Sequence, residues 1–172
     1  RNGSGRSTTV KAIMGLVELY RDVSACTRCP LHAGRTKAVF GSGNADSDLL
    51  FIGEAPGAEE DRQGLPFVGR AGQLLNELLE GIGMKREDVF IANILKCRPP
   101  NNRDPKPEEA VSCRGYLERQ VALVTPTLVI AVGRISAQSL LATDTTIAKL
   151  RGEVQSFGAR DWPLVVMYRP AY

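Results

Sequence analysis

The sequence predicts an α/β fold built on a short, mostly parallel, four-stranded sheet. Four short apolar runs, typical of buried parallel strands, recur along the chain, and segments with helical periodicity separate them. Such an alternation of strands and helices indicates a parallel sheet covered by helices on both faces. At 172 residues the chain has the length of one domain.

The first expected element is a helix from Thr8 to about Val23. Apolar residues recur in it at intervals of three and four, which defines one helix face. We expect this face to be buried; it consists of Val10, Ile13, Met14, Val17 and Tyr20. Residues 1–7 are expected to form a flexible tail, so that the single domain covers residues 8–172.

The later elements follow from the same patterns. The expected strands are Leu49–Ile52, Val89–Ile94, Thr127–Val132 and Leu164–Met167. The expected helices are Gly69–Ile82, a segment that begins at Pro107, and Gly133–Leu141. The expected loops are Ala25–Lys37, Glu54–Pro66 and Cys97–Pro105. Ligands of such sheets bind at the carboxyl ends of the strands, so function is expected in the loops that follow them.

The charge is unevenly distributed along the chain. Residues 1–40 carry a balance of +5, residues 41–95 a balance of −6 and residues 96–172 a balance of +4, which gives the net +3. If the two ends meet in the fold, one face is basic and suits a nucleic acid; the alternative is a solvated mixed surface. No apolar run reaches the ~18 residues of a membrane span, and no secretion signal is present, so we expect a cytoplasmic protein without a membrane partner.

Four cysteines are spaced as two pairs, Cys26-x2-Cys29 and Cys97-x15-Cys113. All four fall in loops or near helix starts, so a pair from one loop can meet a pair from another. A four-thiolate site for zinc or for a four-iron cluster fits this spacing, which does not separate the two metals. Inert thiols, disulfides and a thioredoxin-like pair at Cys26 and Cys29 remain weaker alternatives.

Two segments after expected strands carry candidate binding residues. The loop that begins Gly53-Glu54-Ala55-Pro56-Gly57 has neither the P-loop nor the dinucleotide-binding pattern, and its acids disfavour a nucleoside triphosphate. Phe67 lies between glycines in a loop, where an aromatic ring can stack on a base, although such a residue more often belongs to the core. Asn93 ends an apolar strand; it either bonds a neighbouring turn or offers the donor and acceptor that a pyrimidine edge needs.

Taken together, these motifs resemble family 4, the iron–sulfur family, of the uracil-DNA glycosylases. The matching text is Gly53-Glu54-Ala55-Pro56-Gly57, Gly64-x-Pro66-Phe67-Val68-Gly69-x-Ala71-Gly72-Gln73-Leu74-Leu75 and Asn93-Ile94-x-Lys96-Cys97-Arg98-Pro99-Pro100. The cysteines match in order and spacing. The resemblance covers most of the chain, from about Val17 to its end, and implies a three-layer α/β/α sandwich that acts as a monomer on uracil-containing DNA, single- or double-stranded.

The resemblance also implies the chemistry of the site. Cys26, Cys29, Cys97 and Cys113 would hold a [4Fe–4S] cluster with a structural role. The enzyme would flip deoxyuridine out of DNA and hydrolyse its N-glycosidic bond. Phe67 would stack on the uracil and Asn93 would bond its edge, while Gly53, Glu54 and the Ala55–Pro56 backbone line the pocket. Glu60 would block the 5-methyl group of thymine.

One residue departs from the family pattern. The second motif of the superfamily begins with a histidine that donates to uracil O2, and Arg169 stands in its place in Tyr168-Arg169-Pro170-Ala171-Tyr172. The single histidine, His32, lies in the cysteine loop and is not a replacement. Three interpretations stay open: Arg169 is a permanently charged donor to O2, it weakens catalysis, or the chain binds uracil-DNA without excising the base. The third, a catalytically inactive binding module with the same fold, is the alternative function. Outside the resemblance, a zinc-stabilised nucleotide-binding domain is a further alternative.

Overall fold

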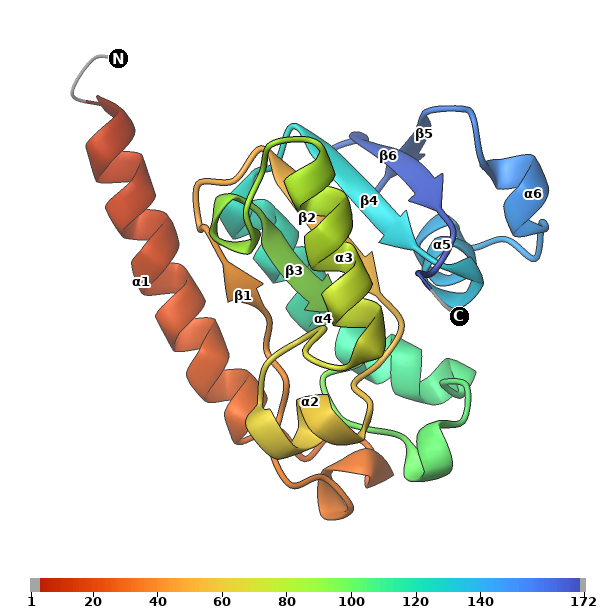
Figure 1. Ribbon diagram of the computed structural model, residues 1–172. Helices are drawn as coiled ribbons and strands as arrows, with labels where there is room; N and C mark the ends of the chain where they lie inside the picture. The colour runs from red at the N-terminus through yellow and green to blue at the C-terminus, as the bar shows by residue number, and fades with distance from the viewer. Residues whose placement is uncertain (1–3, 171–172) are drawn as a thin grey trace.

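The computed structural model describes residues 4–170, which form a mixed six-stranded sheet with the order β1-β3-β2-β4-β6-β5 (Figure 1). The strands are β1 (Ser42–Gly43), β2 (Leu49–Gly53), β3 (Phe90–Asn93), β4 (Leu128–Val132), β5 (Gln155–Phe157) and β6 (Trp162–Met167). The helices are α1 (Ser4–Ser24), α2 (Ala58–Gln63), α3 (Arg70–Gly81), α4 (Pro107–Val124), α5 (Arg134–Leu141) and α6 (Ile147–Leu150). Short 3-10 turns cover Pro30–Ala33, Arg86–Asp88 and Pro100–Asn102.

The four expected strands form the parallel centre of this sheet. β3, β2, β4 and β6 pair in parallel, while β1 and β5 add one antiparallel strand at each edge. The expectation of four strands was therefore too low by these two edges. β1 has two residues and β5 has three, which is too short to leave an alternation in the sequence.

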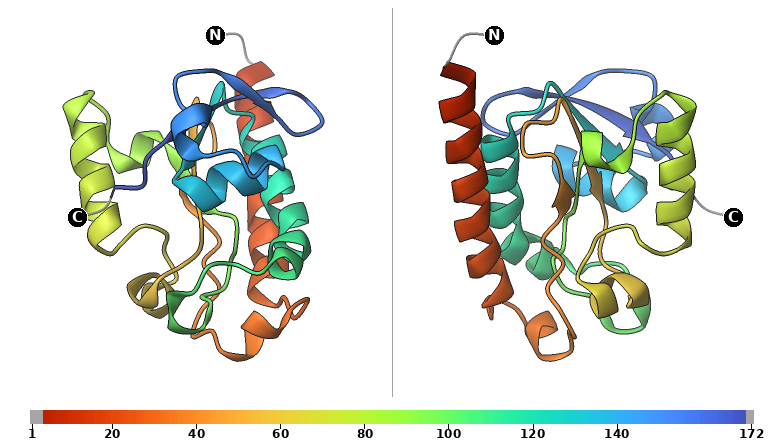
Figure 2. Two further views of the ribbon diagram at one scale, coloured as in Figure 1. Left: turned by 90° about the vertical axis from the view of Figure 1, so that its right-hand side faces the viewer. Right: turned by 60° about the vertical axis from the view of Figure 1, so that its left-hand side comes forward.

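Helices cover both faces of the sheet, as the alternating pattern predicts. α1, α4 and α5 pack with β2, β4 and β6 in one core cluster that includes Leu19, Leu117 and Leu140. α3 covers part of the other face through Leu75 and Leu79, and the views in Figure 2 show it on the side of the sheet opposite α1. No helix among residues 4–170 is both long and apolar enough to cross a bilayer.

Helix α1 buries a different face from the one expected. Its buried residues are Ala12, Leu16, Leu19 and Val23. The face expected to be buried is exposed, with exposed fractions between 47% and 60%, at Val10, Ile13, Met14, Val17 and Tyr20. The helix also begins at Ser4, inside the expected tail, of which residues 1–3 lie outside the described residues.

Two smaller expectations are also corrected. The loop expected over Glu54–Pro66 contains helix α2, which begins after Gly57 and ends at a left-handed Gly64. Leu78, placed on the inward face of its helix with Leu74, is 47% exposed, and the buried positions of α3 are Gly72, Leu75 and Leu79. The stretch Cys97–Pro105 is irregular as expected, apart from one 3-10 turn.

Candidate active site

The site lies where β2 and β3 end side by side. Gly53 and Asn93 are register partners in this parallel pair, so both loops leave the sheet at the same edge. The loops stay together beyond the strands, because the Ile94 amide donates to the Gly53 carbonyl at 2.9 Å and the Leu95 amide to the Glu54 carbonyl at 3.1 Å. The residues of the first quoted motif are thereby fixed beside those of the third.

Phe67, Asn93 and Gly53 converge on one point. A Cβ placed on Gly53 would lie 2.5 Å from both Asn93 Oδ1 and Phe67 Cζ, closer than side-chain carbons approach other atoms. The absence of a side chain at Gly53 therefore leaves room for the aromatic ring and the amide to lie next to each other. This grouping has the composition of a base pocket, with one stacking surface and one group that both donates and accepts.

Asn93 is a buried polar residue with an uncommitted side chain. It is 2% exposed, and no group among residues 4–170 hydrogen-bonds its side-chain amide. Its backbone carbonyl, by contrast, accepts a bond from Lys96 Nζ at 3.0 Å. The interpretation in which the Asn93 side chain bonds a neighbouring turn is therefore wrong, and the amide is available to a ligand.

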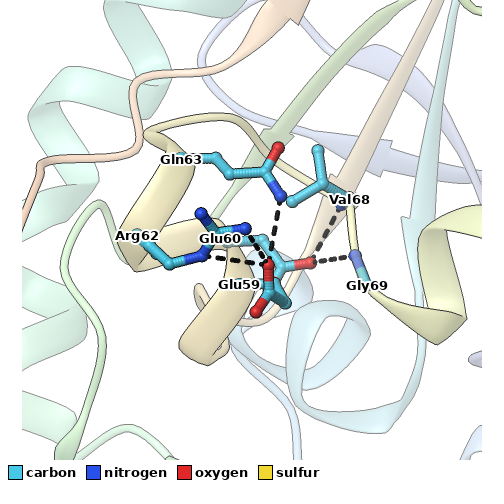
Figure 3. A network of polar contacts seen from close by, with 6 residues as sticks. All are labelled: Glu59, Glu60, Arg62, Gln63, Val68 and Gly69. Carbon is cyan, nitrogen blue, oxygen red and sulfur yellow. Dashed lines mark hydrogen bonds and ion pairs between the residues drawn. The ribbon is translucent and has the colours of Figure 1, made fainter.

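Glu60 spends both carboxylate oxygens on backbone amides. Its Oε1 accepts from Val68 at 3.0 Å and Gly69 at 2.9 Å, and its Oε2 accepts from Gly57 at 3.1 Å. Figure 3 shows the contrast with Glu59, which bonds only Arg62 and Gln63 of its own helix. Glu60 therefore ties α2 to the segment that carries Phe67.

Glu54 and Arg169 face each other across the ends of β2 and β6. Arg169 Nη1 lies 3.8 Å from Glu54 Oε2; the side chain of Glu54 is 19% exposed and that of Arg169 is 59% exposed. Burial raises the pKa of Glu54, and the nearby Arg169 opposes this shift. Asp104, which raises this pKa further, and Arg134, which lowers it, form an ion pair with each other at 3.1 Å. A charged residue therefore follows each parallel strand at this edge.

Ala55 and Pro56 follow Glu54 in the same loop, as the motif requires. Ala55 is half-buried and Pro56 is buried. Their side chains carry no polar atom, so only the backbone of these two residues can bind a substrate. The expected backbone lining of the pocket is compatible with this placement.

The four cysteines line one small cavity between the loop after α1, the loop after β3 and helix α4. Arg35 donates to Cys97 Sγ at 3.2 Å, and the Arg28 amide donates to Cys26 Sγ at 3.5 Å. Burial raises the pKa of the Cys113 thiol to about 11 and also raises that of Cys97, while Arg35 opposes the second shift. Within residues 4–170, no three Cys, His, Asp or Glu side chains are grouped closely enough to hold a single metal ion.

Lys96 links the cysteine loop to the base pocket. It is 1% exposed, and its ammonium donates to the carbonyls of Asn93 and Phe40 and to Gln120 Oε1. Desolvation lowers its pKa to about 7. A second link runs from Asp61 of α2, whose carboxylate accepts from the Thr36 amide at 2.9 Å.

Sequence reasoning missed Asp104, Arg134 and Arg86 as residues of this region. Arg134 directly follows the glycine that ends β4, so the rule that ligands bind at strand carboxyl ends could have identified it. Asp104 lies in the Pro/Asn-rich loop and pairs with it. Arg86 lies before β3 in no motif, and no signal in the sequence places it near Phe67.

Comparison with known proteins gives a consistent result. The sequence profile described as "Uracil DNA glycosylase superfamily" matches residues 40–172. The chain is 44% identical over 168 residues to the type-4 uracil-DNA glycosylase of Archaeoglobus fulgidus, covering 90% of this chain and 84% of the relative. It is 44% identical over 160 residues to the type-4 enzyme of Thermotoga maritima, covering 91% and 82%. The type-5 uracil-DNA glycosylase of Thermus thermophilus is 35% identical over 121 residues, covering 62% and 55%.

Proposed function

The chain belongs to the uracil DNA glycosylase superfamily, and on this premise we propose that it excises uracil from DNA by hydrolysing the N-glycosidic bond. The observation that carries the proposal is the buried, uncommitted amide of Asn93 beside the Phe67 ring over Gly53. An aromatic face and an adjacent donor–acceptor pair fit a flipped pyrimidine. The similarity to type-4 enzymes over most of the chain supports the same activity.

Base recognition is assigned to Phe67 and Asn93. The ring would stack on uracil, and the Asn93 amide would accept from N3–H and donate to O4, which distinguishes uracil from cytosine by its hydrogen-bond pattern. Glu60 is proposed to exclude thymine. Its carboxylate is fixed by three backbone amides and therefore cannot swing away from a 5-methyl group.

Bond cleavage is assigned to Glu54 and Arg169, with the Ala55–Pro56 backbone placing the attacking water. Negative charge develops on the departing uracil and positive charge on the sugar, so electrostatic stabilisation is expected to supply most of the rate. Glu54, when ionised, stabilises the oxocarbenium-like sugar. Arg169 offers a permanent positive charge toward uracil O2, but its ion pair with Glu54 must loosen before it does so.

The cysteines are proposed to hold a [4Fe–4S] cluster. The donor set fits: four thiols line one cavity, and Arg35 and the Arg28 amide already donate to two of the sulfurs. The sulfurs around one zinc ion at ~2.3 Å would lie roughly 3.8 Å apart, and the cysteines are not grouped that tightly. When bound, the cluster would join the loop after α1 to the loop after β3 and stiffen the edge that carries Asn93.

The experiment is a gel assay of uracil excision from a single-stranded oligonucleotide, with Asn93→Ala as the control variant. Alkali-cleavable abasic sites from the parent chain and none from Asn93→Ala support the proposal. Tight binding of uracil-DNA without product would instead favour the binding module that keeps the fold. A colourless protein without iron would favour zinc, whereas absorbance near roughly 400 nm with about four irons per chain supports the cluster.

A further inference from the structure

The segment Pro66–Gly69 holds Phe67 in a conformation that an L-amino acid rarely adopts. The φ angle of Phe67 is +50°, in the left-handed region that is sparsely populated for bulky side chains. Such a conformation persists only where the surroundings impose it, and it often marks a functional residue. The close packing of α3 contributes, because a Cβ on Gly72 would overlap the Phe67 carbonyl.

Arg86 binds the carbonyl side of this segment. Its Nη1 donates to the Phe67 carbonyl at 2.8 Å, its Nη2 donates to the Pro66 carbonyl, and Nη1 also contacts Asn76 Oδ1 at 3.3 Å. The guanidinium makes no ion pair within 4 Å among residues 4–170, and its donors go to backbone oxygens and one amide. Burial lowers the pKa of Arg86, which the charges of Glu87 and Glu60 oppose.

Glu60 binds the amide side of the same segment. Its Oε1 accepts from the Val68 and Gly69 amides (Figure 3). The peptide group between Phe67 and Val68 is therefore held at both ends, its oxygen by a cation and its N–H by an anion. These charge-assisted bonds are stronger than neutral ones, so the backbone at Phe67 is fixed from two separate segments of the chain.

We propose that Arg86 and Glu60 form a clamp on the Phe67–Val68 peptide, and that Arg86 is a positioning residue that presets the Phe67 ring for stacking on the flipped base. The inference rests on the proposed function and goes further by adding a residue that touches no substrate. Arg86 acts through Phe67, so removing it should matter only while the ring is present. A residue that merely stabilises the fold would not show this dependence.

A double-mutant cycle tests the dependence. We expect Arg86→Met to lower kcat/KM for uracil excision about tenfold in the parent chain, but less than about twofold in a Phe67→Leu chain, because coupled residues are non-additive. Lys85→Met, which removes an exposed cation one residue away, is the matched control and should change neither. Equal losses in the two backgrounds would overturn the proposal.

Chymotrypsin provides a readout that does not need activity, since it cuts after phenylalanine in segments that open locally. We expect cleavage after Phe67, followed by mass spectrometry, to accelerate about tenfold in Arg86→Met and to stay unchanged in Lys85→Met. Cleavage after the buried Phe90 should not change. If Arg86→Met does not fold, Arg86→Gln, which keeps one donor, takes its place. Unchanged cleavage after Phe67 overturns the clamp, whereas accelerated cleavage without any excision supports the clamp and refutes the proposed function.

Discussion

Adding one methyl group at Gly53 tests the base pocket most directly. The new Cβ of Gly53→Ala would lie 2.5 Å from Asn93 Oδ1, 2.5 Å from Phe67 Cζ and 2.6 Å from Phe67 Cε2. Heavy atoms that are not bonded rarely come closer than about 3.0 Å and pack at roughly 3.5–4.0 Å. The ring and the amide must therefore each retreat by about 0.5–1 Å. Both are side-chain groups, so we expect the variant to fold.

The displacement is large enough to be seen in the kinetics. A misplacement of about 1 Å can cost roughly a hundredfold in rate, so we expect kcat/KM for uracil excision to fall between about tenfold and a hundredfold. The assay is single-turnover excision from a uracil-containing oligonucleotide, beside a thermal unfolding curve. Gly81→Ala in α3 is the control, because its Cβ would meet no atom within 4 Å. Excision by Gly53→Ala within twofold of the parent, with an intact fold, would refute the pocket as described.

Three further predictions concern Arg169, Glu54 and Cys113. Arg169→His should raise excision roughly tenfold or more if the arginine is a misplaced donor to the developing anion, and an unchanged rate in the gel assay would contradict this. Burial raises the pKa of Glu54, so its ionised form destabilises the fold as the pH rises through that pKa. Glu54→Gln should therefore unfold at a higher temperature than the parent at pH 8, lose this advantage near pH 4, and excise less uracil; a gain at pH 4 as large as at pH 8 would contradict the sign. Cys113→Ser should lower the iron content and the absorbance near roughly 400 nm, whereas an unaltered spectrum would exclude this thiol as a ligand.

The parallel centre of the sheet could be predicted because its strands are buried on both faces. Such strands appear as continuous apolar runs, as in Leu49–Gly53 and Leu128–Val132. The buried face of α1 could not be chosen, because the helix carries two apolar stripes and periodicity alone does not say which one meets a partner. Packing against α4 selects the stripe with Leu16 and Leu19.

The site could be predicted where its residues belong to motifs, and not where the fold alone brings them together. Gly53, Phe67 and Asn93 were expected to share a pocket, and the register of β2 with β3 places them together. Arg86 reaches Phe67 across 19 positions of sequence. Glu60 was expected only as a barrier to thymine, but the structure adds three backbone amides as its partners. These contacts depend on tertiary packing, which no local pattern records.

The two short edge strands have a consequence for the behaviour of the chain in concentrated solution. An open edge next to Val- and Ile-rich strands would be a template for pairing with another chain and hence for aggregation. β1 covers one side with two residues, and the φ of +124° at Gly43 turns the backbone away from a regular strand. β5 covers the other side with three residues. Neither edge offers a long, flat ladder, so the molecule is protected against intermolecular sheet extension while its ligand-binding edge stays open.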